Sequence, residues 1–449
     1  MTTEEILQNI YGFSELRPSQ KAVIEAIETG RDVLALLPTG GGKSLCYQLP
    51  VLKAAGRALV VTPLISLMED QVAELKRLRL KAVCIHSYLD IREKRLIYHQ
   101  LQDYQFIFCS PEWLATDKAR ATVAQLNLTH MVIDEAHCIS EWGYDFRPHY
   151  LLLHEIIKPG MQVIALTATA DDKIIRDINQ LLRRELLLID KREERRNIFL
   201  SVCKSPDKLK EIESLLDTSG PTIIYFSSKK RCNEVHQLLS KRYKGMTYHA
   251  DMTYEDRMSV QLAFLGDRIH YVCATSAFGM GVNKSNVRTV VHYHTPKSVL
   301  QYIQEVGRAG RDGEEAQAIL LYDEEDLHLS YRLLQEEHLS ESDFNLYLNG
   351  AQLTAEKMER LSILRANFPD REVLNVLRKE YHTKLAALRK MAEYGQLTAC
   401  LSHQLYNGEQ SCTHCEYCQG RRLFTFETFK EVHENDDRVA YIKSLFKQG

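Results

Sequence analysis

The sequence lacks any long uninterrupted hydrophobic run. No stretch of about 18 apolar residues occurs in its 449 residues, so we expect no membrane-spanning helix. The first residues lack the basic-then-apolar pattern of a targeting signal, and we expect a cytoplasmic protein. The chain also lacks a large excess of one charge, because it has 57 Lys and Arg and 60 Asp and Glu. Whole-molecule charge therefore indicates no nucleic-acid partner, and any such binding has to come from local grooves.

The composition, 45% hydrophobic and 26% charged, excludes disordered and collagen-like chains. At about 100 to 200 residues per domain, the length predicts two to four domains. Up to about residue 340, short apolar runs alternate with amphipathic helical segments, which is typical of βαβ units on parallel sheets. The strands expected in a first block are 33–37, 58–62, 106–110, 131–134 and 163–167. Those expected in a second block are 222–226, 246–249, 271–274, 289–293 and 318–322.

The charged stretch 190–197 is most simply a solvated connector, and it marks a domain boundary near residue 205. After Asp323 the apolar residues recur at helical spacing. The predicted domains are 1–205, 206–340, a helical domain at 341–420, and a tail at 421–449 with a short amphipathic helix. The predicted fold class is therefore α/β, with two tandem parallel-sheet domains followed by a small helical domain.

A glycine-rich segment follows the first expected strand and precedes an expected helix. Glycines there let backbone N–H groups approach phosphates, while Lys43 supplies a positive charge and Ser44 a hydroxyl for Mg²⁺. The stricter phosphate-loop pattern would have glycine at position 37, where this chain has Leu37. The candidate nucleotide-binding residues are Thr39, Gly40, Gly41, Gly42, Lys43 and Ser44.

Two adjacent carboxylates end the expected strand 131–134, in the sequence Asp134-Glu135-Ala136-His137. In an open α/β sheet, ligands bind at the carboxyl ends of the strands. Asp134 is the candidate holder of Mg²⁺, and Glu135 is the candidate for polarising the water that attacks a γ-phosphate.

These motifs together resemble superfamily 2 helicases, and among them the RecQ family of DNA helicases. The resemblance covers residues 5 to about 420 and rests on PTGGGKS at 38–44, DEAH at 134–137, Thr167-Ala168-Thr169, and QEVGRAGRDG at 304–313. It implies two RecA-like domains and a zinc-stabilised helical domain. It also groups segments 62–68 with Gln71, 110–112, 227–230 and 274–284 with the family's DNA-backbone and coupling motifs.

The resemblance assigns base recognition to three residues. Phe13 and Arg17 would sandwich adenine, and Gln20 would pair with its edge. Core packing is the alternative for Phe13.

In the second block, the motif at 304–313 carries Gln304, Arg308 and Arg311. The two arginines resemble arginine fingers, which stabilise charge on the γ-phosphate. They would share one face if that segment is helical. Because they lie on a different domain from Lys43, ATP could close the cleft between the domains and hydrolysis could reopen it.

The family has an aromatic-rich loop after DEAH that senses single-stranded DNA. Trp142, Phe146 and Arg147 match its stacking and charged positions. Glutamine is common in the family at the position of Glu141. The strength with which this loop couples DNA binding to ATP hydrolysis is therefore an open point of the resemblance.

Four cysteines near the C-terminus have metal-ligand character. Cys412, Cys415 and Cys418 are separated by two residues each, and Cys400 lies upstream. Four thiolates suit a structural Zn²⁺, and the family has such a module here. The upstream gap is shorter than expected, so His403 or His414 could replace Cys400. An iron–sulfur cluster and plain buried thiols are the alternatives.

The resulting hypothesis is an ATP- and Mg²⁺-dependent 3′-to-5′ DNA helicase acting in repair or recombination. The 3′-to-5′ direction follows from the resemblance. The resemblance also implies single-stranded and tailed or branched DNA as partners. A single-stranded-DNA-binding protein is a further candidate partner. A monomer is favoured. The family's winged-helix and C-terminal accessory domains are not visible in this sequence. The main alternative is therefore a DNA-stimulated ATPase that translocates or remodels without efficient unwinding.

Overall fold

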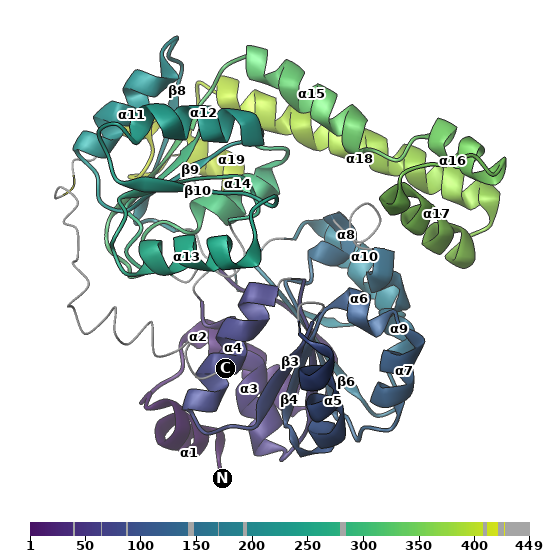
Figure 1. Ribbon diagram of the computed structural model, residues 1–449. Coiled ribbons are helices and arrows are strands. Elements are labelled where there is room, and N and C mark those ends of the chain that lie inside the picture. Colours follow the sequence, from purple (N-terminus) through teal and green to yellow (C-terminus); the bar gives the residue numbers. More distant parts are fainter. Residues whose placement is uncertain are drawn as a thin grey trace. The chain divides into compact units, whose positions relative to one another are not determined.

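A computed structural model describes residues 1–38, 41–63, 65–86, 89–141, 148–168, 170–191, 195–278, 284–406, 411–420 and 426. The chain divides into two compact units (Figure 1). The first comprises Met1–Glu193 and Leu339–Lys379, and the second comprises Glu194–His338 and Glu380–Gly449. Each unit is built around one parallel sheet, as the fold class predicts.

The first sheet has the strand order β3-β4-β2-β5-β6-β1-β7, with every pair parallel. Its strands are β1 (Val33–Leu36), β2 (Ala58–Val61), β3 (Ala82–Ile85), β4 (Phe106–Cys109), β5 (His130–Asp134), β6 (Gln162–Thr167) and β7 (Leu187–Asp190). The helices before β5 are α1 (Thr3–Ile6), the π-helical turn η1 (Leu7–Tyr11), α2 (Pro18–Glu28), α3 (Lys43–Lys53), α4 (Ile65–Arg77), α5 (Ile91–Gln100), η2 (Leu101–Asp103), α6 (Pro111–Leu114) and α7 (Asp117–Ala124). Those after β5 are α8 (Cys138–Glu141), η3 (Pro148–Leu152), α9 (Leu153–Ile156) and α10 (Asp172–Leu182).

The second sheet has the order β10-β11-β9-β12-β13-β8, again with every pair parallel. Its strands are β8 (Ile198–Cys203), β9 (Thr222–Tyr225), β10 (Gly245–Tyr248), β11 (Tyr271–Ala274), β12 (Thr289–His292) and β13 (Ala316–Leu321). The helices among and after them are α11 (Lys208–Asp217), α12 (Lys229–Leu239), α13 (Tyr254–Leu265), α14 (Val299–Val306) and α15 (Glu325–Glu337).

The remaining helices are α16 (Glu341–Leu348), α17 (Ala355–Asn367), α18 (Asp370–Gln396), α19 (Leu401–Tyr406) and α20 (Glu416–Gln419). The expected helical domain at 341–420 is helical, but its residues divide between the two compact units inside α18. The second sheet begins at Ile198, ahead of the boundary expected near residue 205. In the part of the chain that is described, no helix is long and apolar enough to cross a membrane.

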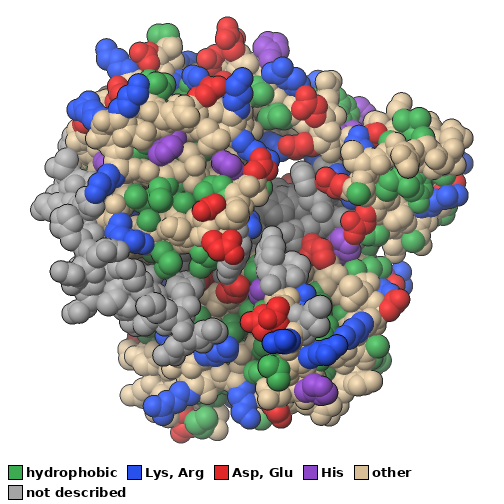
Figure 2. All heavy atoms as spheres, viewed as in Figure 1, with side chains coloured by type: hydrophobic (Ala, Val, Ile, Leu, Met, Phe, Trp, Pro, Cys, Tyr) green, Lys and Arg blue, Asp and Glu red, His purple; other side chains and the backbone are tan. Residues whose placement is uncertain are grey.

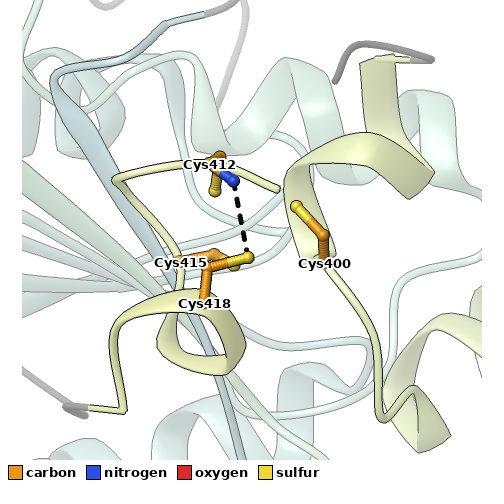
Figure 3. Close-up of side chains that lie close together, drawn as sticks. All are labelled: Cys400, Cys412, Cys415 and Cys418. Atoms are coloured by element: carbon orange, nitrogen blue, oxygen red, sulfur yellow. Dashed lines mark hydrogen bonds between the residues drawn. The ribbon is translucent and has the colours of Figure 1, made fainter. Parts of the chain in front are cut away.

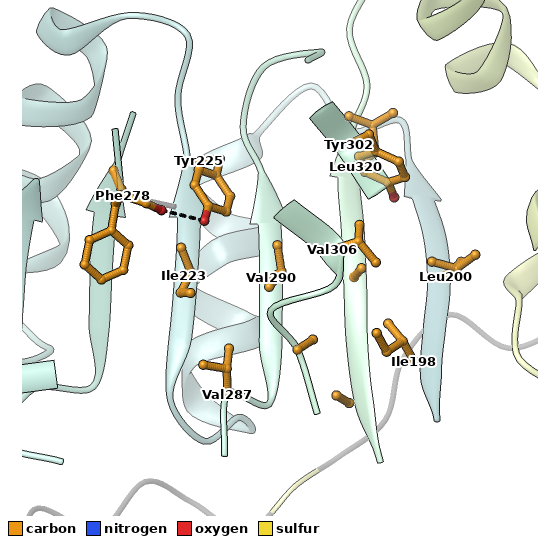
Figure 4. Packing of buried hydrophobic residues seen from close by; sticks show 14 of the residues in the cluster. Ile198, Leu200, Ile223, Tyr225, Phe278, Val287, Val290, Tyr302, Val306 and Leu320 are labelled. Atoms are coloured by element: carbon orange, nitrogen blue, oxygen red, sulfur yellow. Dashed lines mark hydrogen bonds between the residues drawn. The ribbon is translucent and has the colours of Figure 1, made fainter. Parts of the chain in front are cut away.

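Strand alternation explains how the second sheet buries both faces. Ile223 and Tyr225 of β9 pack in one cluster with residues of α13 and α14 (Figure 4). Ile224 and Phe226 pack with α11 and α12 on the other face. Successive side chains of a strand point to opposite faces, and burial on both faces requires a nearly continuous apolar run. This burial fixes the register, so the carboxyl ends of the strands meet at one edge.

The ten expected strands all form, within one or two residues of their predicted ends. Three strands were missed: β3, β7 and β8. Each lies at the edge of its sheet. On the face shown in Figure 2, basic and acidic side chains are interspersed, in keeping with the formal net charge of −3.

Candidate functional site

The glycine-rich segment lies between β1 and α3, as expected. Gly42 has φ +72°, in the left-handed region, and precedes the first residue of α3, Lys43. A Cβ on Gly41 would lie 2.8 Å from the Pro38 carbonyl oxygen. Glycine is therefore required at both positions, by strain at Gly42 and by close backbone approach at Gly41.

Two charged side chains from different elements meet beside this segment. The Lys43 Nζ lies 2.7 Å from Glu135 Oε1, and both side chains are more than four-fifths buried. Glu135 directly follows β5 and has φ +51°, an unusual conformation for a residue with a side chain. Strained backbone of this kind costs about 1 to 3 kcal/mol and clusters at functional sites.

Asp134 is the last residue of β5 and is 5% exposed. Its Oδ1 accepts the Glu135 backbone N–H at 3.0 Å, and its Oδ2 accepts the Gln71 side-chain amide at 3.1 Å. Burial raises the pKa of Asp134, while the neighbouring Lys43 charge opposes that rise. The carboxylate is thus held in a fixed orientation by two donors.

His137 joins this group to β6. Its Nδ1 lies 2.8 Å from Thr167 Oγ1 and 3.4 Å from Glu135 Oε2. Burial lowers the pKa of His137 to about 4, so the ring is neutral at pH 7. The sequence motif at 167–169 therefore touches DEAH through a side chain.

The expected base-recognition residues lie around the start of α2. Phe13 is 53% exposed, which rules out the core-packing alternative. The Gln20 Oε1 accepts the Arg17 backbone N–H at 3.0 Å, and its Nε2 donates to the Gly41 carbonyl at 3.1 Å. Gln20 therefore bridges this segment and the phosphate loop.

The contact between Gln71 and Asp134 could not be found from the sequence. The resemblance had grouped Gln71 with segments that touch DNA backbone, and Tyr47 had no assigned role. In the structure Tyr47 donates to Gln71 Oε1 at 2.6 Å. No local pattern marks such a contact, because the residues come from α3, α4 and β5.

The residues present fit a magnesium nucleotide. A carboxylate, a hydroxyl and a lysine stand at one edge of the sheet, in Asp134, Ser44 and Lys43. Oxygen donors suit Mg²⁺, and the exposed backbone at Gly41 and Gly42 suits phosphate.

In the second unit, α14 ends at Val306 and the residues after it form successive turns. The segment with Arg308 and Arg311 is therefore not helical, and the condition under which they would share a helix face is not met. Arg308 is 5% exposed and hydrogen-bonds to the Tyr225 hydroxyl, whereas Arg311 and Gln304 are partly exposed. Gly310, beyond the end of α14, has a left-handed φ of +54°, a conformation that favours glycine.

Buried pairs hold this arginine segment. Glu305 Oε2 lies 2.8 Å from His292 Nε2, with both side chains at most 6% exposed. Arg195 donates to the Ala309 carbonyl at 3.2 Å, and Asn197 donates to the Gly310 carbonyl at 2.9 Å. The end of the stretch 190–197, expected to be a solvated connector, thus supports the arginine motif.

The four cysteines come together (Figure 3). The sulfur atoms of Cys400, Cys412, Cys415 and Cys418 all lie within 4.8 Å of one another. A tetrahedral Zn²⁺ site with Zn–S bonds of about 2.3 Å separates its sulfurs by about 3.8 Å, so the set fits zinc. Within the described chain this group contains no histidine, and His414 instead bonds Ser402 at 3.1 Å.

The cysteine loop also covers the open edge of β8. The Leu200 N–H donates to the His414 carbonyl at 2.9 Å. Glu416 Oε2 accepts the Ser201 hydroxyl at 2.6 Å and the Val202 N–H at 3.2 Å. Covering an edge strand blocks its pairing with other chains.

Some predicted residues lie outside the described part of the chain. They are Thr39, Gly40, Trp142, Phe146 and Arg147. The same holds for residues 279–283 of one coupling segment.

Two family models match the chain. The DEAD/DEAH box helicase model covers residues 17–178, and the helicase conserved C-terminal domain model covers residues 207–313. Each match falls on one of the two parallel sheets.

Curated relatives match both sheets together. The probable ATP-dependent DNA helicase RecS of Bacillus subtilis is 36% identical over 80% of this chain and 74% of that protein. The ATP-dependent DNA helicase RecQ of Pasteurella multocida is 37% identical over 75% of this chain and 54% of that protein. The chain thus spans three-quarters of the first relative and about half of the second.

Solved structures match the fold at low identity. The helicase MrfA bound to DNA has a TM-score of 0.62 and 20% identity, covering 75% of this chain and 53% of that chain. The DEAD-box helicase Mss116 bound to single-stranded RNA has a TM-score of 0.63 and 19% identity, covering 86% of this chain and 90% of that chain. These matches confirm two tandem RecA-like sheets.

Proposed function

The chain belongs to the RecQ family of ATP-dependent DNA helicases, and from this premise we propose that it moves 3′-to-5′ along single-stranded DNA and separates duplexes. Repair or recombination of DNA is the proposed setting. The observation that carries the proposal is the group Lys43, Asp134 and Glu135, which joins a phosphate loop to strand-end carboxylates.

Each residue of this group has one role in ATP hydrolysis. Lys43 binds the outer phosphates, and its pairing with Glu135 keeps it beside the loop until nucleotide arrives. Asp134 and Ser44 would hold Mg²⁺, which would supply positive charge to neutralise the phosphates. Glu135 orients and polarises the attacking water, and neutral His137 lies beside Glu135 with its Nδ1 hydrogen-bonded to Thr167.

The second unit supplies positive charge for the transition state. Arg308 and Arg311 are the proposed arginine fingers, and Gln304 is proposed to act in the same motif. The buried Glu305–His292 pair holds the end of α14, shortly before these arginines. Since these residues and Lys43 belong to different units, hydrolysis needs both units and can drive their movement.

Nucleotide choice is assigned to Phe13, Arg17 and Gln20. Exposed Phe13 is available to stack on a base, and Gln20 would exchange a loop contact for the adenine edge. A site built to hydrogen-bond one base rejects others because its own polar groups are left unpaired.

DNA contact is assigned to Trp142, Phe146 and Arg147 on the resemblance. Stacking of a base on such an aromatic side chain contributes about 1 to 3 kcal/mol and tolerates any sequence. Relatives named DNA helicases at 36% and 37% identity support DNA over RNA.

We assign Zn²⁺ to the four cysteines, in a role that holds the fold. Their loop closes the β8 edge, so losing the metal would uncover that strand. A monomer, a cytoplasmic location and a single-stranded-DNA-binding protein partner stay predictions. Light scattering, cell fractionation and co-purification test them in turn.

The proposal is tested by ATP-driven strand displacement on short duplexes with a 3′ tail, a 5′ tail or blunt ends, while ATP hydrolysis is followed in parallel. We expect displacement of the 3′-tailed duplex alone, and none with Lys43→Ala. Hydrolysis stimulated by DNA without displacement on any duplex would instead indicate a translocase or remodeller.

A further inference from the structure

A chain of buried hydrogen bonds runs through the first unit from η1 to the end of β5. Tyr11 donates to Gln48 Oε1 at 2.9 Å, and Gln48 in turn hydrogen-bonds to the Tyr47 hydroxyl. Tyr47 donates to Gln71 Oε1 at 2.6 Å, and Gln71 Nε2 donates to Asp134 Oδ2 at 3.1 Å. The side chains beyond Tyr11 are each at most 6% exposed, namely those of Gln48, Tyr47, Gln71 and Asp134.

The direction of this chain follows from its last acceptor. The Gln71 amide turns its nitrogen to Asp134, so its oxygen faces Tyr47 and accepts the Tyr47 hydroxyl. Burial raises the pKa of Tyr47 well above the ordinary value, so its hydroxyl remains a donor. Hydrogen bonds aligned in one direction polarise one another, which strengthens the final contact to Asp134.

The two ends of the chain lie at different parts of the nucleotide site. Asp134 is the proposed holder of Mg²⁺. Tyr11 directly precedes Gly12 and Phe13, in the segment proposed to read adenine. Helices α3 and α4, which supply the middle, are labelled in Figure 1.

We propose that Gln71 is a positioning residue for the magnesium-holding carboxylate of Asp134, and that Tyr47, Gln48 and Tyr11 extend this support to the adenine-reading segment. This inference rests on the proposed function, since it names what orients the same site. Groups that orient a metal-holding carboxylate typically account for about 10- to 100-fold in metal affinity or activity.

The test uses the full-length protein and replaces Gln71 by Met, which keeps the side-chain length and removes the amide. Gln162→Met is the matched control, because the Gln162 amide donates to the Ile27 and Arg31 carbonyls at 2.8 and 2.6 Å, away from Asp134. Affinity for ADP is measured by calorimetry with Mg²⁺ and with EDTA, and turnover is measured against Mg²⁺ concentration.

For Gln71→Met we expect the Mg²⁺ concentration at half-maximal turnover to rise about 10- to 100-fold, with ADP affinity in EDTA unchanged. Gln162→Met should match wild type in both measurements. Equal Mg²⁺ dependence in Gln71→Met and wild type, or an equal shift in both variants, would overturn the assignment.

Tyr47→Phe keeps the proposal testable if Gln71→Met fails to fold, because it removes only one oxygen. In Tyr47→Phe the Mg²⁺ concentration at half-maximal turnover should also rise, but by less than in Gln71→Met. In Tyr11→Phe the rise should be smaller still. Shifts that do not decline along the chain would contradict it. Failure of the proposed function looks different, since wild type itself would then neither bind nor hydrolyse ATP.

Discussion

The two sheets present opposite chemistry at the carboxyl ends of their strands. The first offers two carboxylates beside one lysine, with Lys43 and Glu135 already paired. The second offers arginines, with Arg308 buried against Tyr225 and Glu305 held by His292. In the proposed function, the same parallel-sheet architecture would supply phosphate and metal binding in one unit and transition-state charge in the other. On that proposal neither unit has the complete set, so hydrolysis would require both.

Removing the second unit's charge should have the largest effect. We expect Arg308→Ala to lower ATP turnover by about 10³- to 10⁵-fold, because the transferring phosphoryl group loses one of its stabilising guanidinium groups. Steady-state hydrolysis with saturating single-stranded DNA measures this. Arg242→Ala is the control, since Arg242 pairs with Asp217 on the exposed surface of the same unit. Near-normal turnover in Arg308→Ala would mean that the first unit works alone.

On the first unit, Glu135→Gln should lower turnover by about 10²- to 10⁴-fold while ATP still binds. The amide keeps the shape and can still contact Lys43, but it cannot polarise water. Glu155→Gln, at a partly exposed pair with Arg120, serves as the control in the same assay. If Glu135→Gln hydrolyses ATP at the control's rate, another group activates the water.

The cysteine cluster extends the comparison, because among the residues described only the second unit has a candidate metal site at its sheet edge. We expect Cys415→Ser to lower zinc below one per chain and to cost at least about 4 kcal/mol of stability. Zinc content and chemical denaturation measure these. Cys232→Ser, at a buried lone cysteine of the same unit, should keep its zinc. Full zinc in Cys415→Ser would show the ligand set to be wrong.

Acid should destabilise the first unit through His137. Native His137 stays neutral down to its pKa of about 4, whereas the unfolded residue takes up a proton below its ordinary pKa of 6.5. The unfolded state therefore binds more protons in this window, and the free energy of unfolding falls with decreasing pH by up to about 3 kcal/mol.

This slope is measured by denaturant unfolding from pH 7 to pH 4 with tryptophan fluorescence. Both tryptophans, at positions 113 and 142, belong to the first unit, so the signal reports on that unit. His137→Gln should flatten the slope, and His99→Gln, at an exposed site, should not. An unchanged slope in His137→Gln would place the acid sensitivity elsewhere.

Central strands and consecutive motifs could be predicted from the sequence, because their signal is local. Buried strands such as β2 and β9 are continuous apolar runs. The edge strands β7 and β8 carry a weaker signal, since β7 alternates partly buried and exposed residues and runs into the charged stretch 190–197, and β8 follows that stretch directly.

The same distinction holds within the candidate site. Lys43, Asp134 and Glu135 stand in short motifs at strand ends, so residue type and spacing were enough to find them. The support around them was not visible, because the Gln71–Asp134 and His292–Glu305 contacts join different elements. Only the folded arrangement of strands and helices brings such pairs together.

The division of labour between the units is tested most directly by equilibrium binding of a nonhydrolysable ATP analogue in Mg²⁺, with wild type, Lys43→Ala and Arg308→Ala compared by calorimetry. We predict that Lys43→Ala binds about 10- to 100-fold more weakly, because it loses a charge-assisted hydrogen bond to phosphate. Arg308→Ala should bind like wild type although it does not turn over. Weak binding by Arg308→Ala together with normal binding by Lys43→Ala would contradict the division.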